Sequence, residues 1–333
     1  MNTLHAKSTC CQAAVRRYGT RRRQCGNCGS TWRIRRKKRG RKAKRASTRL
    51  VLAYLDHRAS NVRELAKRRK EGKSSSQRAL ARSLAYLVRA NPEPGRSLVS
   101  SRGRLILVAD AIWYYVRGKK YTIYVLLIRP RLENEAVIWQ PYLAPGHEDM
   151  AGWLAALATL PPGIQGRIGA LVCDGGTGIT NLAYRQGWLL QRCHFHLLAA
   201  LQNYLTTGVR SRQRPFALEV MRLAQSIIND PHEAAARGAL RTLNTIYQQT
   251  RSRGLRRTIR GLNLHWREYR TYITYPRWRL PATSNAAESC IQCIRDLLYR
   301  CRGFRSLGQL TRWLAAFTIH KKIIRCRWKN QPN

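Results

Sequence analysis

Apolar residues recur at helical spacing between residues 47 and 90, which indicates a group of short helices. The spacing is interrupted at Glu71-Gly72-Lys73, and Ser74 or Ser75 can cap the helix that follows. Two helices joined by a glycine turn are typical of a helix-turn-helix, whose second helix enters the major groove of DNA. An ordinary helical hairpin gives the same pattern, so this interpretation depends on charge and position.

The pattern changes after residue 90. Prolines end the helical spacing, and residues 91–103 are expected to form a linker. We expect strands at 105–110, 121–128 and 136–143, a helix at 148–159, a strand at 168–173, a helix at 179–186, and a strand at 188–191. Three strands followed by alternating helices and strands predict an α/β fold with a mixed sheet, in the strand order of a ribonuclease H-like domain. Residues 194–272 and 286–325 again show helical spacing.

Charge narrows the choice of partner. The chain has 63 Lys and Arg against 16 Asp and Glu, which gives a formal net charge of +47. A compact chain with this charge repels itself unless a polyanion is near, and DNA phosphates release counterions when Lys or Arg neutralises them. A hydrophobic content of 44% excludes a disordered basic tail. No amphipathic helix has a clean basic face with exposed aromatics, so we expect double-stranded DNA and no membrane as the partner.

Localisation follows from what the sequence lacks. No run approaches the roughly eighteen apolar residues of a membrane span. Residues 1–12 contain no apolar core of a secretory signal. We therefore expect a cytoplasmic, DNA-associated protein whose ten cysteines are thiols or metal ligands.

The N-terminal 45 residues hold four cysteines and almost nothing to build a core, so they predict a small metal-bound module followed by a basic tether. Cys25 and Cys28 form one knuckle of a zinc ribbon, with glycines that permit its tight turn. The other knuckle is irregular, because Cys10 and Cys11 are adjacent and His5 is nearby. We expect Cys25 and Cys28 to bind Zn²⁺ with Cys10 or Cys11.

Acidic residues are scarce, so their positions are informative. Asp110 and Asp174 each follow an apolar run, and the ends of strands are where the sites of open α/β sheets collect. Neighbouring carboxylates repel unless cations lie between them, and carboxylates suit Mg²⁺ or Mn²⁺. Alternatively, Asp110 faces solvent or caps a turn, and Asp174 begins the glycine turn at 174–176.

Several motifs together resemble the catalytic domain of Mutator-like transposases and related bacterial insertion-sequence enzymes. They are Leu107-Val108-Ala109-Asp110, Val172-Cys173-Asp174-Gly175, Cys193-His194-Phe195-His196, Thr283-Ser284-Asn285-Ala286-Ala287-Glu288, Ile294-Arg295 and Gly303-Phe304-Arg305-Ser306. The resemblance covers residues 104–320, about two thirds of the chain. The Thr-Ser-Asn-x-x-Glu motif is its most specific part.

The resemblance implies a ribonuclease H-like fold with an Asp-Asp-Glu triad and a helical insertion before the glutamate. The triad residues in this sequence are Asp110, Asp174 and Glu288. The stretch before Glu288 is too long for one loop, so we place a helical insertion at 198–275 between core segments at 104–197 and 276–333.

Two details of the triad region stay open. Ser284 or Asn285 can cap the helix that contains Glu288. The simpler interpretation of Glu288 is an acid that stabilises the N-terminus of this helix without binding a metal. Asp296 is the alternative third carboxylate.

Two further pairs have metal-ligand spacing. Cys193 and His196 can share a helix face as metal ligands do, or form a buried thiol beside a structural histidine. The resemblance implies a structural role for them beside the triad. We expect Cys290 and Cys293 to pack in the core.

These observations predict a DDE transposase that uses two Mg²⁺ or Mn²⁺ ions for DNA cleavage and strand transfer. Its partners are the terminal repeats of its element and target DNA, and joining two ends requires a homodimer or higher oligomer. We expect Gln77, Arg78 and Arg82 to read bases, and Arg295 to contact DNA. The alternative is a non-catalytic DNA-binding protein, either a domesticated transposase or a repressor, with the same fold and charge.

Overall fold

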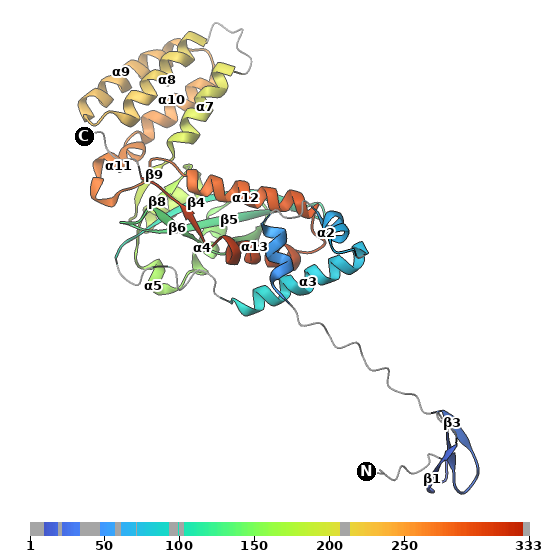
Figure 1. Ribbon diagram of the computed structural model, residues 1–333. Helices are drawn as coiled ribbons and strands as arrows, with labels where there is room; N and C mark the ends of the chain where they lie inside the picture. Colours follow the sequence, from blue (N-terminus) through green and yellow to red (C-terminus); the bar gives the residue numbers. More distant parts are fainter. Residues whose placement is uncertain are drawn as a thin grey trace. The chain divides into compact units, whose positions relative to one another are not determined.

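The computed structural model describes residues 10–18, 22–33, 47–56, 61–70, 72–92, 99, 103–206 and 214–328. The chain divides into two compact units, Met1–Ala46 and Ser47–Asn333 (Figure 1). His5, all but the first residue of the basic tether expected at 33–45, and most of the linker expected at 91–103 lie outside the described residues.

The smaller unit is a three-stranded antiparallel sheet. Its strands are β1 (Val15–Tyr18), β2 (Arg22–Cys25) and β3 (Thr31–Arg33), in the order β1-β2-β3. The turn after β2 has Gly29 at a φ of 72°, and its N–H donates to the carbonyl of Cys25. Cys25, 2% exposed, is the one buried hydrophobic side chain among the described residues of this unit. A sheet with so little core depends on another source of stability, such as a bound metal.

The larger unit is built on a mixed sheet, which confirms the predicted α/β class. Its strands are β4 (Leu105–Val116), β5 (Lys119–Pro130), β6 (Glu135–Ile138), β7 (Tyr142–Pro145), β8 (Ile168–Cys173), β9 (Leu189–Arg192) and β10 (Ile323–Arg325). The order is β10-β6-β5-β4-β8-β9, and β7 also pairs with β5. β4 pairs antiparallel with β5 and parallel with β8, which in turn pairs parallel with β9.

Two sequence expectations about strands were wrong. The strand expected at 136–143 is two strands, β6 and β7, separated at Pro141, whose missing N–H cannot donate to a ladder. The segment at 286–325 does not stay helical to its end. Lys322, with a φ of 37°, stops the preceding helix, and the β-branched pair Ile323 and Ile324 then joins the sheet beside β6 as part of β10.

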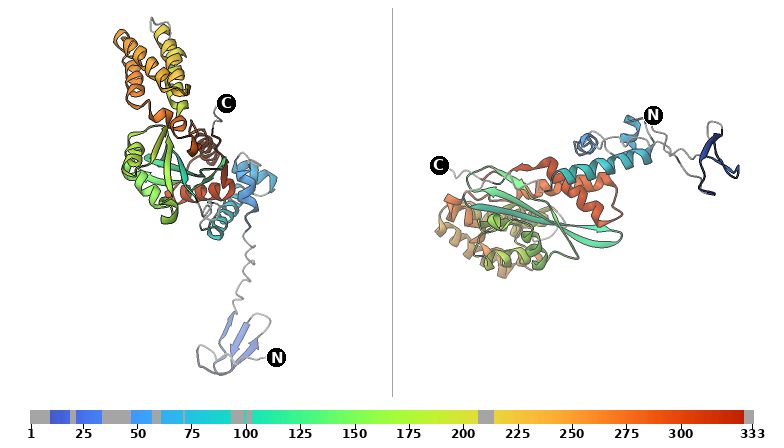
Figure 2. Two further views of the ribbon diagram at one scale, coloured as in Figure 1. Left: turned by 90° about the vertical axis from the view of Figure 1, so that its left-hand side faces the viewer. Right: turned by 90° about the horizontal axis from the view of Figure 1, so that it is seen from below.

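Helices cover both faces of the sheet. Apolar side chains alternate along its central strands, so each face presents an apolar surface that a helical layer buries. Ile106 and Val108 of β4 belong to the core cluster formed with α12 (Asn285–Cys301) and α13 (Leu307–Lys321). Leu105 and Leu107 face the opposite cluster, which contains α4 (Met150–Ala158), α5 (Pro162–Gln165) and α6 (Thr177–Arg185). Figure 2 shows the two helical layers from further directions.

Three N-terminal helices extend the first of these layers. They are α1 (Arg49–Leu55), α2 (Val62–Arg68) and α3 (Lys73–Ala90). α1 and α3 pack against α13, and the Tyr54 and Trp313 ring centres are 5.2 Å apart. The three helices, which the sequence predicts as a DNA-binding domain at 46–90 before a linker, thus share their core with the sheet domain. The expected serine cap of α3 was wrong: the extended backbone of Gly72 precedes Lys73, so both serines lie inside the helix.

A separate group of helices follows β9 and precedes α12 in the sequence (Figure 1). It comprises α7 (His194–Thr206), α8 (Arg214–Asn229), α9 (Glu233–Gln249), α10 (Arg253–His265), η2 (Glu268–Arg270), α11 (Thr271–Thr274) and η3 (Pro276–Trp278). It has its own apolar core, including Val220, Leu243 and Ile259. The fully buried Gln191 amide of β9 joins it to the sheet, donating to the Tyr269 carbonyl and accepting from the backbone N–H of Tyr272.

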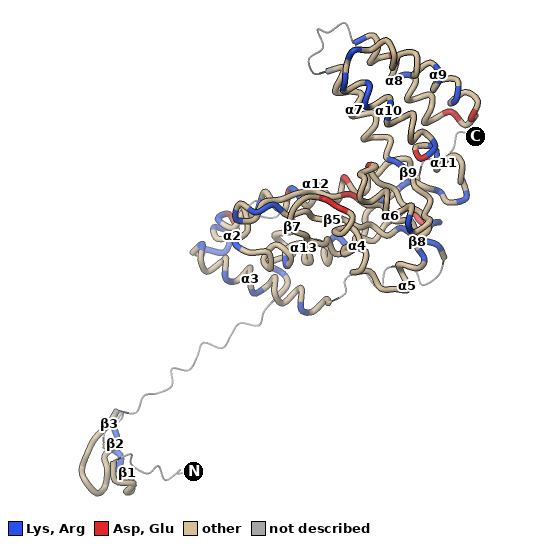
Figure 3. The backbone as a smooth tube through the Cα atoms, turned by 180° about the vertical axis from the view of Figure 1, so that it is seen from behind, with Lys and Arg blue, Asp and Glu red and all other residues tan. Residues whose placement is uncertain are grey.

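Positive charge is spread over most of these elements. Figure 3 shows Lys and Arg on α2, α3 and α12 and on the helical group α7–α10. None of the described helices is long and apolar enough to cross a membrane.

Candidate active site and cysteine cluster

The three carboxylates of the predicted triad line one cavity of about 570 Å³. Asp110 comes from β4, Asp174 from the loop after β8, and Glu288 from α12. His196 and Arg295 line the same cavity. Residues far apart in the sequence are therefore brought together, with one imidazole and one guanidinium beside them.

Asp110 reaches the cavity from the middle of β4, not from its end as the sequence suggested. The parallel pairing of β4 with β8 stops at Val108 and Val172, so the edge of β4 beyond these residues is not covered by β8. Asp110 has the same side-chain direction as Val108 and points towards α12. Its carboxylate accepts the N–H of Ala111 at 2.7 Å. Asp110 is accessible because the pairing of β4 with β8 ends just before it, although β4 itself continues.

Asp174 lies directly after β8 in a tight turn. Its carboxylate accepts the N–H of Gly176 at 2.8 Å. Gly175 has a φ of 97°, and a Cβ there would overlap the side chain of Arg192, so only glycine fits. The Arg192 guanidinium donates to the Gly175 carbonyl at 3.0 Å and forms an ion pair with Glu268. The helical group thereby holds the loop that carries Asp174.

Glu288 lies in the first turn of α12, and Ser284 occupies the N-cap position. The Ser284 hydroxyl does not cap the helix but donates to the Glu288 carboxylate at 3.2 Å. Asp296, the alternative third carboxylate, is exposed, accepts from the Gln292 amide at 2.9 Å, and is not among the described residues that line the cavity. Glu288, and not Asp296, is therefore the third carboxylate that lines the cavity with the two aspartates.

Burial and like charge make the cavity unfavourable for bare carboxylates. Burial, with smaller contributions from Asp174 and Glu288, raises the pKa of Asp110 to about 6, although the hydrogen bond from Ala111 opposes this. The pKa of His196 is also raised, to about 9, by its hydrogen bond with Cys193 and by the nearby carboxylates, which favours the charged imidazolium. A cation bound among these groups would relieve the repulsion.

Cys193 and His196 adjoin Glu288. One ligand atom from each of the three lies within 4.8 Å of the others, so they offer sulfur, nitrogen and oxygen to a metal ion. The Cys193 sulfur also accepts the N–H of Ser284 at 3.2 Å, which ties the start of α7 to the start of α12. Cys290 is fully buried in the core, as expected, and Cys293 is partly buried against the same core.

A fourth carboxylate, which the sequence did not reveal, lies near Asp174. A Cβ on Gly176 would be 3.2 Å from Oε1 of Glu148 and 3.4 Å from Oδ1 of Asp174. Glu148 accepts the indole N–H of Trp153 at 2.8 Å, and burial raises its pKa. Its position before a helix resembles ordinary capping, which its neighbour Asp149 performs, so the sequence offered no signal for it.

The predicted DNA-contacting residues fall into two places. Gln77 and Arg78 line a cavity of about 670 Å³ shared by α2, α3 and the α12–α13 loop. Seven basic side chains line it: Arg63, Lys73, Arg78, Arg300, Arg302, Arg305 and Arg312. Arg82 is exposed one turn further along α3 and is not among the described lining residues. Arg295 lines the carboxylate cavity instead.

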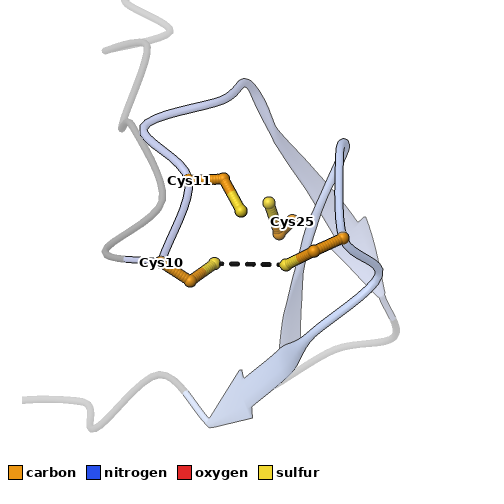
Figure 4. A group of neighbouring side chains, drawn as sticks. Cys10, Cys11 and Cys25 are labelled. Carbon is orange, nitrogen blue, oxygen red and sulfur yellow. Dashed lines mark hydrogen bonds between the residues drawn. The ribbon is translucent and has the colours of Figure 1, made fainter.

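The smaller unit gathers four thiols that could hold zinc (Figure 4). The ligand atoms of Cys10, Cys11, Cys25 and Cys28 all lie within 4.8 Å of one another, and the Cys10 and Cys28 sulfurs are 3.4 Å apart. The hydroxyl and backbone of Ser30 lower the pKa of Cys28, which favours the thiolate that binds metal. Adjacent cysteines can thus supply one half of a four-thiol site.

Comparisons with known proteins leave the chain's family open. No protein-family model matches the chain, and no curated protein matches its sequence.

We expect the purified protein to contain one zinc ion per chain. Cys28→Ser should remove it, because three thiols bind zinc less tightly than four. Cys293→Ser, which changes a cysteine outside the cluster, should retain it. Elemental analysis after mild chelation would measure both variants, and zinc that persists in Cys28→Ser would contradict the assignment.

In metal-free buffer, Asp110→Asn should stabilise the protein in a pH-dependent way. The folded state raises the pKa of Asp110 from 3.8 to about 6, so ionisation of this carboxyl lowers stability as the pH rises through about 6. The variant should therefore match the parent at pH 4 and exceed its free energy of unfolding by about 1–3 kcal/mol at pH 7.5.

Urea unfolding at the two pH values measures this difference. Asp296→Asn, which removes an exposed carboxylate from α12, is the control and should change neither value. An equal effect of Asp110→Asn at both pH values would refute the electrostatic explanation.

Proposed function

We propose that this chain is a DDE transposase that cleaves and joins DNA with two Mg²⁺ or Mn²⁺ ions. The observation that carries the proposal is the meeting of Asp110, Asp174 and Glu288 around one cavity in a chain of net charge +47. A strongly basic protein gathers three of its few carboxylates where they repel one another. Hard divalent cations and a DNA phosphate account for both features.

The arrangement of the sheet supports a ribonuclease H-like catalytic core. Across the sheet, β5 pairs antiparallel with β4, and β8 and β9 then continue the sheet in parallel. Helices cover both faces. The helical group at α7–α11 interrupts this core between the second and third carboxylates. The proposed fold therefore has the insertion where the resemblance to Mutator-like transposases requires it.

The three carboxylates that line the cavity are donors that Mg²⁺ or Mn²⁺ prefers, which supports the proposal of a hard metal centre. Burial holds the pKa of Asp110 well above its ordinary value, and a bound cation would favour its ionised form. Bound Mg²⁺ would activate a water or 3′-hydroxyl and stabilise the departing 3′-oxygen. Asp110, Asp174 and Glu288 would hold the ions. Ser284, by donating to Glu288, fixes one carboxylate oxygen and leaves the other for coordination.

Other cavity residues would act on the DNA. Arg295 would bind a non-bridging phosphate oxygen, since a guanidinium on the cavity wall complements that charge. The Arg-lined cavity around Gln77 and Arg78 would bind the duplex further from the cleavage point. We propose the terminal repeats and target DNA as partners, and a homodimer or higher oligomer as the active form, because two DNA ends must be joined.

Asp110→Asn, Asp174→Asn and Glu288→Gln should each reduce Mg²⁺-dependent cleavage by about 1,000-fold or more, because each removes a metal-holding charge. The substrate is DNA that carries the repeats flanking the protein's own coding sequence. DNA affinity without metal should change little. Asp296→Asn, on the same helix as Glu288, is the matched control and should cleave like the parent.

The outcomes separate the two function classes. Cleavage that survives in all three variants would refute the triad. A parent protein that binds these repeats but does not cut them with Mg²⁺ or Mn²⁺ would support the non-catalytic DNA-binding protein instead.

Alanine at Gln77, Arg78 and Arg82 should weaken binding to the terminal repeats by about 10-fold per base contact and leave random duplex nearly unaffected. Contacts to bases specify a sequence, whereas contacts to phosphates do not. Arg89→Ala, in the last turn of α3, is the control. Equal losses on both DNAs, measured by fluorescence anisotropy, would show that this surface binds phosphates alone.

A further inference from the structure

Three large aromatic side chains near the carboxylate cavity are exposed. Trp113 is 63% exposed, Tyr115 52%, and Tyr299 85%. Trp153, at 1%, and Trp313, at 5%, are examples of buried aromatics of the same unit. Single exposed aromatics are ordinary, but aromatics gathered beside a cavity mark a binding surface.

Trp113 and Tyr299 line a groove of about 860 Å³. Its wall is the uncovered edge of β4 at 111–114, facing the C-terminal half of α12. The groove shares Ala111, Ile112 and Arg295 with the carboxylate cavity. It shares Arg302 and Gly303 with the Arg-lined cavity at α3. The three cavities are therefore contiguous, and the aromatic groove lies between the other two.

The groove is held in shape by its surroundings. β4 and β5 pair continuously out to Val116 and Lys119, which makes the hairpin rigid. Tyr115 contacts the Trp113 ring edge-on with ring centres 5.7 Å apart, and Lys120 lies 5.3 Å from the Trp113 ring centre. On the other side, Tyr114 packs on the buried Phe304 of the α12–α13 loop at 6.0 Å.

We propose that this groove binds unpaired nucleotides of the DNA strand whose phosphate lies among the carboxylates, an inference that rests on the proposed function. Bases stack on aromatic rings regardless of sequence, and arginines along the same path hold the phosphates. In a duplex, neighbouring pairs cover the base faces, so only unpaired nucleotides can use Trp113 and Tyr299.

The chemistry of the groove disfavours a protein occupant. Arg295 and Arg302 line it, and no acidic residue is among its described lining residues. A dry protein contact would leave these guanidinium groups buried without partners. A second copy of the chain would bring the same large positive charge to a positive surface. A nucleotide strand supplies both the apolar faces and the anionic groups that the groove lacks.

Trp113→Ala and Tyr299→Ala should each weaken binding of a short fluorescent single-stranded oligothymidylate by about 10-fold. Affinity for a duplex of the same length should change less than twofold. Trp113→Phe should recover most of the lost affinity, because phenylalanine also stacks. Tyr275→Ala, which removes an aromatic side chain 45% exposed outside the groove, is the matched control.

These titrations use the full chain without divalent metal, so they do not depend on cleavage. If the Trp113 and Tyr299 variants lose single-strand affinity but the parent protein does not cut DNA, the proposal for the groove stands and the proposed transposase function is rejected. Equal losses on single strand and duplex, or no loss on either, would overturn the groove.

A second measurement does not require the variants to fold. An oligonucleotide that carries 5-iodouracil should cross-link to Trp113 or Tyr299 of the parent protein under ultraviolet light, as mapped by peptide mass spectrometry. Cross-links found exclusively at other residues would also overturn the proposal.

Discussion

Asp110, Asp174 and Glu288 repel one another in a partly buried cavity, and much of the surrounding structure serves to keep them there. Each carboxylate is held by a different contact: the N–H of Ala111, the N–H of Gly176, and the hydroxyl of Ser284. These three donors fix direction without adding charge. Among the described residues that line the cavity, the positive side chains are Arg295 and His196, whose Nδ1 lies 3.5 Å from Oε1 of Glu288. Three carboxylates against two basic side chains leave an excess of negative charge that a bound cation would offset.

The helical group contributes to this constraint from a distance. Arg192 bridges it to the Asp174 loop through Glu268, and the buried Gln191 amide binds it at two further backbone atoms. Cys193, the next residue along the chain, accepts the N–H of Ser284 and so sets where the helix of Glu288 begins. Three consecutive positions, Gln191, Arg192 and Cys193, therefore connect the second and third carboxylates. This explains how a long insertion can separate them in sequence without loosening the site.

Local sequence predicted the mixed sheet and most of its strands, whereas it was the resemblance to Mutator-like transposases that implied Glu288 as the third carboxylate beside the two aspartates. Local sequence placed Asp174 correctly because an apolar run does end there, and it placed Asp110 wrongly because strand pairing, not composition, ends beside it. Glu148 was missed because its proximity to the Asp174 turn arises from the fold, and a single acid before a helix carries no sign of it in the sequence. β10 was missed because its three residues pair with β6 across most of the chain. Pairing between residues so far apart in the sequence produces no periodic pattern of apolar residues from which it could be predicted.

Charge links the proposed metal and DNA sites. Three carboxylates outnumber the basic His196 and Arg295 on the cavity wall, so a bare cavity would disfavour the scissile phosphate proposed to lie there. The flanking surface would behave oppositely, because Arg302 and the other basic residues near α3 would attract the rest of the proposed DNA strand. Without divalent ions, DNA would be held at the flanks but kept from the centre. With them, the cavity would attract the phosphate, and each ligand would strengthen the binding of the other. Such coupling would confine cleavage to complexes in which metal and strand are both present.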